Sequence, residues 1–266
     1  MKFASLKKIL TAGLIGLTCV AATAHAEDLL DQVKARGTLR IGLEGTFPPF
    51  NSKDTKTGDL VGFDVDIAKA VAAKLGVKPE FITTEWSGII AGLQAGKFDV
   101  IVNQVGVTDA RKQVLDFSPA YTYSGAELIQ RKNDDRQFKS LEDLKGHKLG
   151  VGLGTNYMDM AKAVGGIDIK TYPGAPEYLR DLAAGRLDAA LNDRLMVAYL
   201  LKQSDLPLRK GAMVGTGNPS AIPFKKGNPK FAQAIDDAMK QLEADGTFAK
   251  ISDKWFGIDV TKPVTK

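Results

Sequence analysis

The chain has 266 residues, of which 44% are hydrophobic and 25% are charged, with 36 Lys and Arg against 31 Asp and Glu. This composition, with its single Cys, excludes a disulfide-rich scaffold, a disordered tail protein and a protein with several membrane spans. The length allows one large domain or two of roughly 120 residues, each large enough to bury a core.

The first 26 residues have the features of a secretory signal peptide. Lys2, Lys7 and Lys8 precede an uncharged and mostly apolar run at 9–23, and small residues stand at positions 24 and 26. A membrane anchor is the alternative, but it would need about 20 apolar residues, more than this run provides. We therefore expect cleavage after Ala26 and a mature protein in the periplasm.

A lipoprotein signal is a third possibility for this segment, because Cys19 lies in the apolar run. Lipobox sequences usually have a small residue just before the Cys and Leu three residues before it. Thr18 and Gly16 hold those two places here. The segment therefore fits a cleaved signal peptide better than a lipid anchor at Cys19.

Removing the signal peptide changes the charge and the chemistry of the chain. Three Lys leave with it, so 33 basic residues face 31 acidic ones, and neither nucleic acid nor an anionic membrane is an expected partner. Cys19 and His25 leave as well, and His147 is then the one His. Thiol chemistry, disulfides and His-based metal sites are excluded together, and we expect no metal and no cofactor.

Hydrophobic periodicity predicts strands that alternate with helices, which is typical of an α/β fold. Strands are expected at 39–43, 77–82, 98–102, 149–153 and 221–224. Amphipathic helices are expected at 63–75, 87–95, 231–242 and 248–255. In the helix at 63–75, Asp64 and Asp66 fall on the side opposite the apolar residues, so we expect both of them on the polar face.

Two segments of the first half are repeated, in the same order, in the second half. The run at 93–103 and the run at 182–192 share the pattern Leu-x-Ala-Gly-basic-apolar-Asp, then three small or apolar residues and Asn. The strand-turn starts at 39–43 and 149–153 are also alike. Helix-Gly-strand junctions are common in general, but two repeats in one order favour a pair of similar α/β lobes.

The repeats suggest where the lobes begin and end. We expect a first lobe made of 27–120 plus 222–266 and a second lobe made of 121–221. If the C-terminal helices pack back on the first lobe, the chain crosses between lobes twice, near 118–125 and 217–224. Two crossing strands would form a hinge.

Two charged residues are placed to contact a ligand, because ligands of open α/β sheets bind at the carboxyl ends of the strands. Arg111 follows the strand at 98–102, on a short helix capped by Thr108, and its guanidinium could clamp a carboxylate with two parallel hydrogen bonds. A solvated surface arginine is its alternative. Asp193 follows the matching strand of the second half and could accept an ammonium group, or could instead cap a helix that begins at Arg194.

Other motifs carry weaker signals. The glycines at 150–154 lack the spacing of a dinucleotide-binding loop, but the backbone N–H groups of Thr155 and Asn156, at a helix start, could hold an anion. Phe47 and Trp86 lie in loops after predicted strands and could form the apolar walls of a cleft or the edge of a core. The sequence shows no catalytic set, although paired carboxylates of a hydrolase stay possible.

Motifs distributed over the chain resemble those of the polar amino-acid solute-binding proteins of ATP-driven importers. These motifs are Gly-Thr-Phe-Pro-Pro-Phe at 45–50, Val-Gly-Phe-Asp-Val-Asp at 61–66, Phe-Asp-Val at 98–100, Thr-Asp-x-Arg at 108–111, Asp-Phe-Ser-x-x-Tyr at 116–121 and the segment 245–257. The resemblance covers essentially the whole mature chain. It implies a two-lobed periplasmic-binding-protein (Venus-flytrap) fold, with two hinge strands, that closes over an amino acid.

The resemblance also implies a role for each candidate residue. Arg111 corresponds to the residue that grips the α-carboxylate, assisted by backbone N–H groups of Gly106 and Asn156, and Asp193 corresponds to the acceptor of the α-ammonium. The residues that match side-chain-pocket positions are Glu44, Phe47 and Trp86. The rest of the expected ligand-binding set is Gln104, Gly154 and Thr155. Relatives commonly have Thr or Ser where this chain has Gly106, so the lost hydroxyl would have to be replaced by water, by Gln104 or by a ligand of different shape.

The function implied by the resemblance is capture of an L-amino acid and its delivery to a membrane permease by a monomeric protein. The residues at 103–105 and 150–157 are most similar to those of cystine-binding members, so cystine is the expected ligand, and another polar amino acid is the alternative. Two other functions stay open: a periplasmic dehydratase on the same scaffold, with Glu44 as proton donor, and a sensory module that docks on a receptor. The presence of Asp193 favours binding over lysis.

Overall fold

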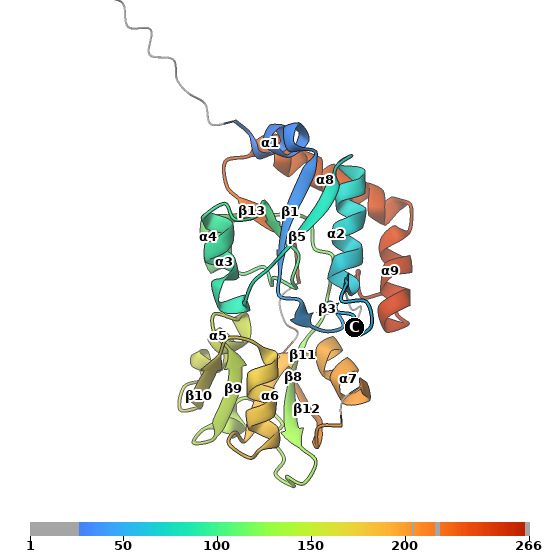
Figure 1. Cartoon of the computed structure of the whole chain (residues 1–266). Helices are drawn as coiled ribbons and strands as arrows, with labels where there is room; N and C mark the ends of the chain where they lie inside the picture. Colours follow the sequence, from blue (N-terminus) through green and yellow to red (C-terminus); the bar gives the residue numbers. More distant parts are fainter. Residues whose placement is uncertain (1–26, 204, 216–218, 264–266) are drawn as a thin grey trace, which may run out of the picture.

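The structure, a computed structural model, describes residues 27–203, 205–215 and 219–263, so the expected signal peptide lies outside the described residues. The described chain forms two five-stranded sheets with helices packed against them and a small three-stranded sheet (Figure 1). We call the part built on strand β1 (Thr38–Leu43) the first lobe and the part built on β9 (Lys148–Gly152) the second lobe. The predicted α/β class is confirmed.

The first lobe contains the sheet with strand order β5-β1-β6-β13-β7. β1 is parallel to β5 and β6, whereas β13 is antiparallel to β6 and β7. The other strands are β5 (Lys78–Thr83), β6 (Val100–Ile101), β7 (Leu115–Phe117) and β13 (Pro223–Lys225). The small sheet consists of β2 (Thr46–Phe47), β3 (Asn51–Lys53) and β4 (Leu60–Val61). The helices are α1 (Leu29–Arg36), α2 (Phe63–Lys74), α3 (Trp86–Gln94), α4 (Asp109–Val114), α8 (Pro229–Ala244) and α9 (Thr247–Phe256).

The second lobe contains the sheet with strand order β10-β9-β11-β8-β12. β9 is parallel to β10 and β11, and β8 is antiparallel to β11 and β12. The other strands are β8 (Ala126–Arg131), β10 (Asp168–Tyr172), β11 (Ala189–Asp193) and β12 (Leu208–Gly215). The helices are α5 (Asn156–Val164), α6 (Ala175–Ala183), α7 (Arg194–Gln203) and the short 3₁₀ helix η1 (Glu142–Leu144).

The repeated sequence pattern has the same structural role in both lobes. Asp99 accepts a hydrogen bond from the backbone N–H of Arg40 (2.8 Å) and donates its own N–H to the Arg40 carbonyl (2.9 Å). Asp188 makes the same pair of bonds with Lys148, at 2.8 and 2.9 Å. Each Asp therefore ties its segment to the second strand of its own sheet, β1 or β9, which explains why the pattern occurs twice.

The chain crosses between the two sheets twice. It leaves the first sheet after β7 and enters the second at β8, then leaves the second after β12 and returns at β13. The two crossing segments are joined by hydrogen bonds from Ser220 N to the Thr122 carbonyl (2.8 Å) and from Tyr121 N to the Ser220 carbonyl (2.9 Å). Residues 216–218, part of the expected hinge, lie outside the described residues, and the lobe boundaries at 120/121 and 221/222 stay a prediction.

The cores of the lobes follow from the periodicity of their helices. In α8, the side chains of Phe231, Ile235, Met239 and Leu242 recur every three or four residues and pack with α1 and α2, so the C-terminal helices belong to the first lobe. The second-lobe sheet has apolar clusters on both faces. At the N-terminus of α7, Leu195 and Met196 join the first-lobe core, so this second-lobe helix also contacts the other lobe.

The burial of Asp64 differs from what the helical periodicity predicts. It was expected on the polar face of α2, but it is fully buried. The reason is its position in the first turn, where Asn51, Gln104 and Tyr121 surround it and donate hydrogen bonds to its carboxylate. In the described part of the chain, the structure contains no helix with the length and apolar content needed to span a bilayer.

Candidate functional site

A cavity lies between the lobes at the carboxyl ends of parallel strands from both sheets. Glu44 follows β1, Gln104 follows β6, Gly152 ends β9 and Asp193 ends β11, and all four line the cavity. Of the predicted ligand-binding residues, the structure places these in its lining: Glu44, Phe47, Trp86, Gln104, Thr155, Asn156 and Asp193. This is the place where an open α/β sheet binds its ligands.

Arg111, Gly106 and Gly154 lie together at the Trp86 side of the cavity rather than in its lining. The Thr108 hydroxyl caps α4 by accepting from Arg111 N (3.2 Å), as expected. The Arg111 guanidinium lies over the Trp86 ring, 5.4 Å from its centroid, and donates to the Gly106 carbonyl at 2.7 Å and the Gly154 carbonyl at 3.1 Å. Arg111 is therefore not a solvated surface residue, and burial lowers its pKa.

Asp193 caps α7, which is one of the two roles considered for it, and it also lines the cavity. Its Oδ1 accepts a hydrogen bond from Leu195 N (2.7 Å) and so caps α7, while its Oδ2 accepts one from the Tyr157 hydroxyl at 3.5 Å. The side chain is 6% exposed, and burial raises its pKa. Capping uses one carboxylate oxygen, so the other is available on the cavity side.

A buried polar network connects the cavity wall with the first crossing segment. Asn103 donates to Glu44 Oε2 (2.8 Å) and accepts from Asn51 Nδ2 (2.8 Å), and Asn51 in turn lies 3.2 Å from Asp64 Oδ2. Gln104 Nε2 donates to Asp64 Oδ1 at 2.7 Å. Burial raises the pKa of both Glu44 and Asp64 to about 7.

Gln104 is held in an unusual backbone conformation at the inner end of this network. Its φ of 51° lies in the left-handed region, which a residue with a side chain seldom adopts. Besides Asp64, its Nε2 donates to the Thr122 hydroxyl (3.2 Å) in the crossing segment. Its Oε1 is buried and has no hydrogen-bond partner among the described residues. The amide oxygen of Gln104 is therefore an acceptor that no described residue uses.

Sequence reasoning missed several residues of the cavity wall. They are Asn103, Gly152, Tyr157, Gly174, Ala175, Tyr178, Leu191, Asn192 and Ser220. The two asparagines end the repeated pattern, so their matching positions after β6 and in β11 could have identified them. Tyr157 and Tyr178 lie in helices and carry no such signal. Among the residues that the structure describes, no group of three or more His, Cys, Asp and Glu side chains could hold a metal ion.

The fold and the cavity agree with comparisons to known proteins. Residues 39–258 match the family of bacterial extracellular solute-binding proteins, family 3, and the chain belongs to this family. The L-cystine-binding protein TcyJ of Escherichia coli K12 is 40% identical over 98% of this chain and 100% of its own length. The L-cystine-binding protein TcyA of Bacillus subtilis is 39% identical over 88% of this chain and 87% of its own.

This chain is also similar to amino-acid-binding proteins of known structure. An ancestral arginine-binding protein bound to arginine superposes with a TM-score of 0.79 and 41% identity, and covers 84% of this chain and 99% of its own. The two-lobed α/β fold and the membership in the solute-binding proteins, expected from the sequence motifs, are therefore confirmed.

Proposed function

We propose that this protein binds an L-amino acid, cystine, between its lobes in the periplasm and delivers it to the permease of an ATP-driven importer. The observation that carries the proposal is a cavity lined by both lobes, with a desolvated guanidinium at one edge and a buried carboxylate on its wall. These two groups match the opposite charges of an amino-acid zwitterion, and charge pairs gain strength in a site that excludes water.

The residues present suffice to hold the zwitterion. Arg111 has five N–H donors and uses two of them in the bonds to Gly106 and Gly154, so donors remain for an α-carboxylate. The N-terminus of α5, capped by the Thr155 hydroxyl, adds backbone N–H groups and a favourable dipole. Asp193 Oδ2 and Gln104 Oε1 are the acceptors for the α-ammonium.

The composition of the cavity wall and the names of two relatives favour cystine over an amino acid that has a single ammonium group. TcyJ and TcyA are both named as L-cystine-binding proteins. Glu44 offers a second carboxylate for the second ammonium of cystine, and the rings of Phe47 and Trp86 cover apolar surface. Residues 27–266 contain no Cys, so the protein cannot exchange thiols with a bound disulfide.

Membership in the extracellular solute-binding family supports the remaining parts of the proposal. The signal peptide at 1–26 would direct export, with cleavage after Ala26. The partner would be the membrane permease of the importer. The protein would act as a monomer, because the cavity is completed by the two lobes of one chain.

A ligand screen tests the proposal. Purified residues 27–266 are mixed with cystine, arginine, glutamine, histidine or lysine, and the melting temperature and the heat of binding are measured. Cystine should give the largest rise in melting temperature and a dissociation constant at least tenfold below those of the other amino acids. A larger effect of another amino acid would contradict cystine alone, whereas no effect of any amino acid would contradict the whole proposal.

A further inference from the structure

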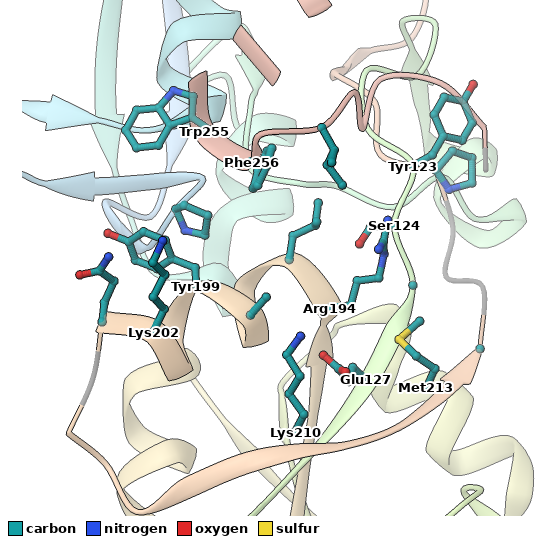
Figure 2. Close-up of a pocket in the computed structure, with 18 of the residues that line it drawn as sticks. Tyr123, Ser124, Glu127, Arg194, Tyr199, Lys202, Lys210, Met213, Trp255 and Phe256 are labelled. Carbon is teal, nitrogen blue, oxygen red and sulfur yellow. The ribbon is translucent and has the colours of Figure 1, made fainter. Parts of the chain in front are cut away.

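A second and larger hollow lies between α7 of the second lobe and α9 of the first (Figure 2). Its volume is about 1150 Å³, against about 50 Å³ for the cavity between the strand ends. We call it the α7–α9 groove. Arg194 lines the groove, and Asp193, the residue before it in the sequence, lines the cavity. The two hollows therefore lie on either side of the start of α7.

The floor of the α7–α9 groove holds a carboxyl group with an unused acceptor. Glu127 of β8 is 7% exposed, and its Oε2 is buried with no hydrogen-bond partner among the described residues. A buried acceptor without a partner costs about 1–3 kcal/mol of desolvation, so native proteins seldom leave one unsatisfied. Oε2 of Glu127 therefore points to a ligand that carries an N–H or O–H donor.

Two cationic groups stand beside this carboxyl group. Arg194 begins α7, and Lys210 lies on β12. Burial raises the pKa of Glu127, and the positive charges of Lys210 and Arg194 offset part of this rise. Neither cation is hydrogen-bonded to Oε2 of Glu127. Figure 2 shows Glu127 and Lys210 on neighbouring strands, with both side chains directed into the groove. Such a pair of cations suits a carboxylate.

The shape of β12 explains why Lys210 reaches the groove. In a regular strand, residues three apart point to opposite faces, so Lys210 and Met213 could not line the same hollow. The pairing of β12 with β8 shifts register between these two residues, and both of them line the groove. Irregularities of this kind are common beside binding sites, where they redirect a side chain.

The walls of the groove are apolar and aromatic. Tyr199 comes from α7, and Trp255 and Phe256 come from α9, so both lobes contribute aromatic rings. Met213 and Ile258, which border the groove, are 49% and 50% exposed and belong to the most exposed large hydrophobic side chains of the described chain. A ligand with an apolar body would cover them.

We propose that the α7–α9 groove is a second binding site, for a small N-acylated amino acid. Its carboxylate would be held by Lys210 and Arg194, its amide N–H would donate to Oε2 of Glu127, and its apolar side chain would lie against Tyr199 and Trp255. Such a ligand lacks the ammonium group that the cavity requires. The chemistry of the groove thus differs from that of the cavity, and this site is independent of the proposed function.

Calorimetric and NMR titrations with N-acetyl-L-phenylalanine test the second site. The wild-type protein should bind this probe saturably. 3-Phenylpropanoate lacks the amide N–H, and N-acetyl-L-phenylalaninamide lacks the carboxylate, so both should bind at least tenfold more weakly. Absence of saturable binding, or equal binding of all three compounds, would overturn the proposal.

Variants locate the binding. Lys210→Gln should weaken binding of the probe at least tenfold, as should Ala198→Trp, which fills the groove from α7. Lys162→Gln, at an exposed Lys on α5, is the matched control and should bind as the wild type does. Unchanged binding by Lys210→Gln, or loss of binding in Lys162→Gln, would place the probe elsewhere and contradict the second site.

Discussion

The guanidinium of Arg111 in the first lobe donates a hydrogen bond to the carbonyl of Gly154 in the second, with a distance of 3.1 Å. The lobes are therefore in contact on the cavity side, through the same side chain that we propose to hold the α-carboxylate. In a hinge motion, a contact of this kind forms only when the lobes approach, so the residue that we propose for the ligand site would also take part in closure.

Arg111→Ala should weaken cystine binding at least 100-fold, because it removes the charge-assisted bonds to the carboxylate and the contact with the second lobe. This corresponds to about 3 kcal/mol. Isothermal titration calorimetry measures the loss. Lys112→Ala, at the exposed neighbouring residue, should bind cystine as the wild type does. Tight binding by Arg111→Ala would exclude the proposed role of this residue.

Glu44→Gln should weaken cystine binding about tenfold at pH 7.5 and leave glutamine binding nearly unchanged. The reason is that only cystine offers a second ammonium to the carboxylate. Since the pKa of Glu44 is raised to about 7, the carboxyl must lose a proton to bind that ammonium at lower pH. Wild-type affinity for cystine should therefore rise between pH 5.5 and 7.5.

Calorimetry of both proteins across this pH range checks the prediction. In Glu44→Gln, the cystine affinity should be nearly independent of pH, because the titrating group has been removed. A wild-type affinity that falls as the pH rises would show that protonated Glu44 is the binding form, opposite to our expectation.

Asp64 should make the ligand-free protein less stable as the pH rises. Burial raises its pKa from 3.8 to about 7, so the folded state holds a proton that the unfolded chain has released over this window. The free energy of unfolding should thus fall between about pH 4 and 7, by up to about 1.4 kcal/mol per pH unit from this group. Glu44 contributes in the same direction.

Asp64→Asn should reduce this pH dependence, although it also lowers stability by about 1–3 kcal/mol because the amide cannot accept all of the carboxylate's hydrogen bonds. Urea titrations at several pH values measure both effects. Asp59→Asn, at an exposed residue, should retain the wild-type slope. An equal slope in Asp64→Asn would show that the group does not titrate in this window.

Asp99→Ala and Asp188→Ala should differ in cost although the two residues hold equivalent strands. The Asp99 side chain is fully buried between Arg36 and Arg40, so its removal leaves two partly buried guanidinium groups without their shared partner and should cost about 3 kcal/mol. The Asp188 side chain is 25% exposed beside Arg136, and its removal should cost about 1 kcal/mol. Urea unfolding followed by circular dichroism measures both, and a larger loss for Asp188→Ala would contradict this ranking.

The parts of the fold that depend on local pattern could be predicted from the sequence. The helix predicted at 63–75 is observed at Phe63–Lys74, and the expected cap at Thr108 is present. The strand predicted at 98–102 is shorter, Val100–Ile101, although Asp99 and Val102 still bond to the neighbouring strand through their backbone N–H groups. Local patterning therefore locates an element better than it locates its ends.

The buried polar network could not be predicted, because it depends on contacts between distant segments. Asp64 shares a helix with exposed charged residues, and it becomes a buried group through contacts with Asn51 of β3, with Gln104 and with the crossing segment at Tyr121. The α7–α9 groove likewise depends on the irregular pairing of β12, which periodicity does not show. By contrast, seven of the residues that line the cavity belong to the ligand-binding set expected from the sequence.

The two tryptophans of the chain give each hollow its own optical reporter. Trp86 lines the cavity beneath Arg111, and Trp255 lines the α7–α9 groove, where its indole N–H donates to Asp66 (2.8 Å). The tryptophan fluorescence of the unlabelled protein is therefore the sum of the emission from one Trp in the cavity and one Trp in the groove. A Trp255→Phe variant isolates the emission from the cavity, and a Trp86→Phe variant isolates that from the groove, so occupancy of the two sites can be followed separately in one cuvette.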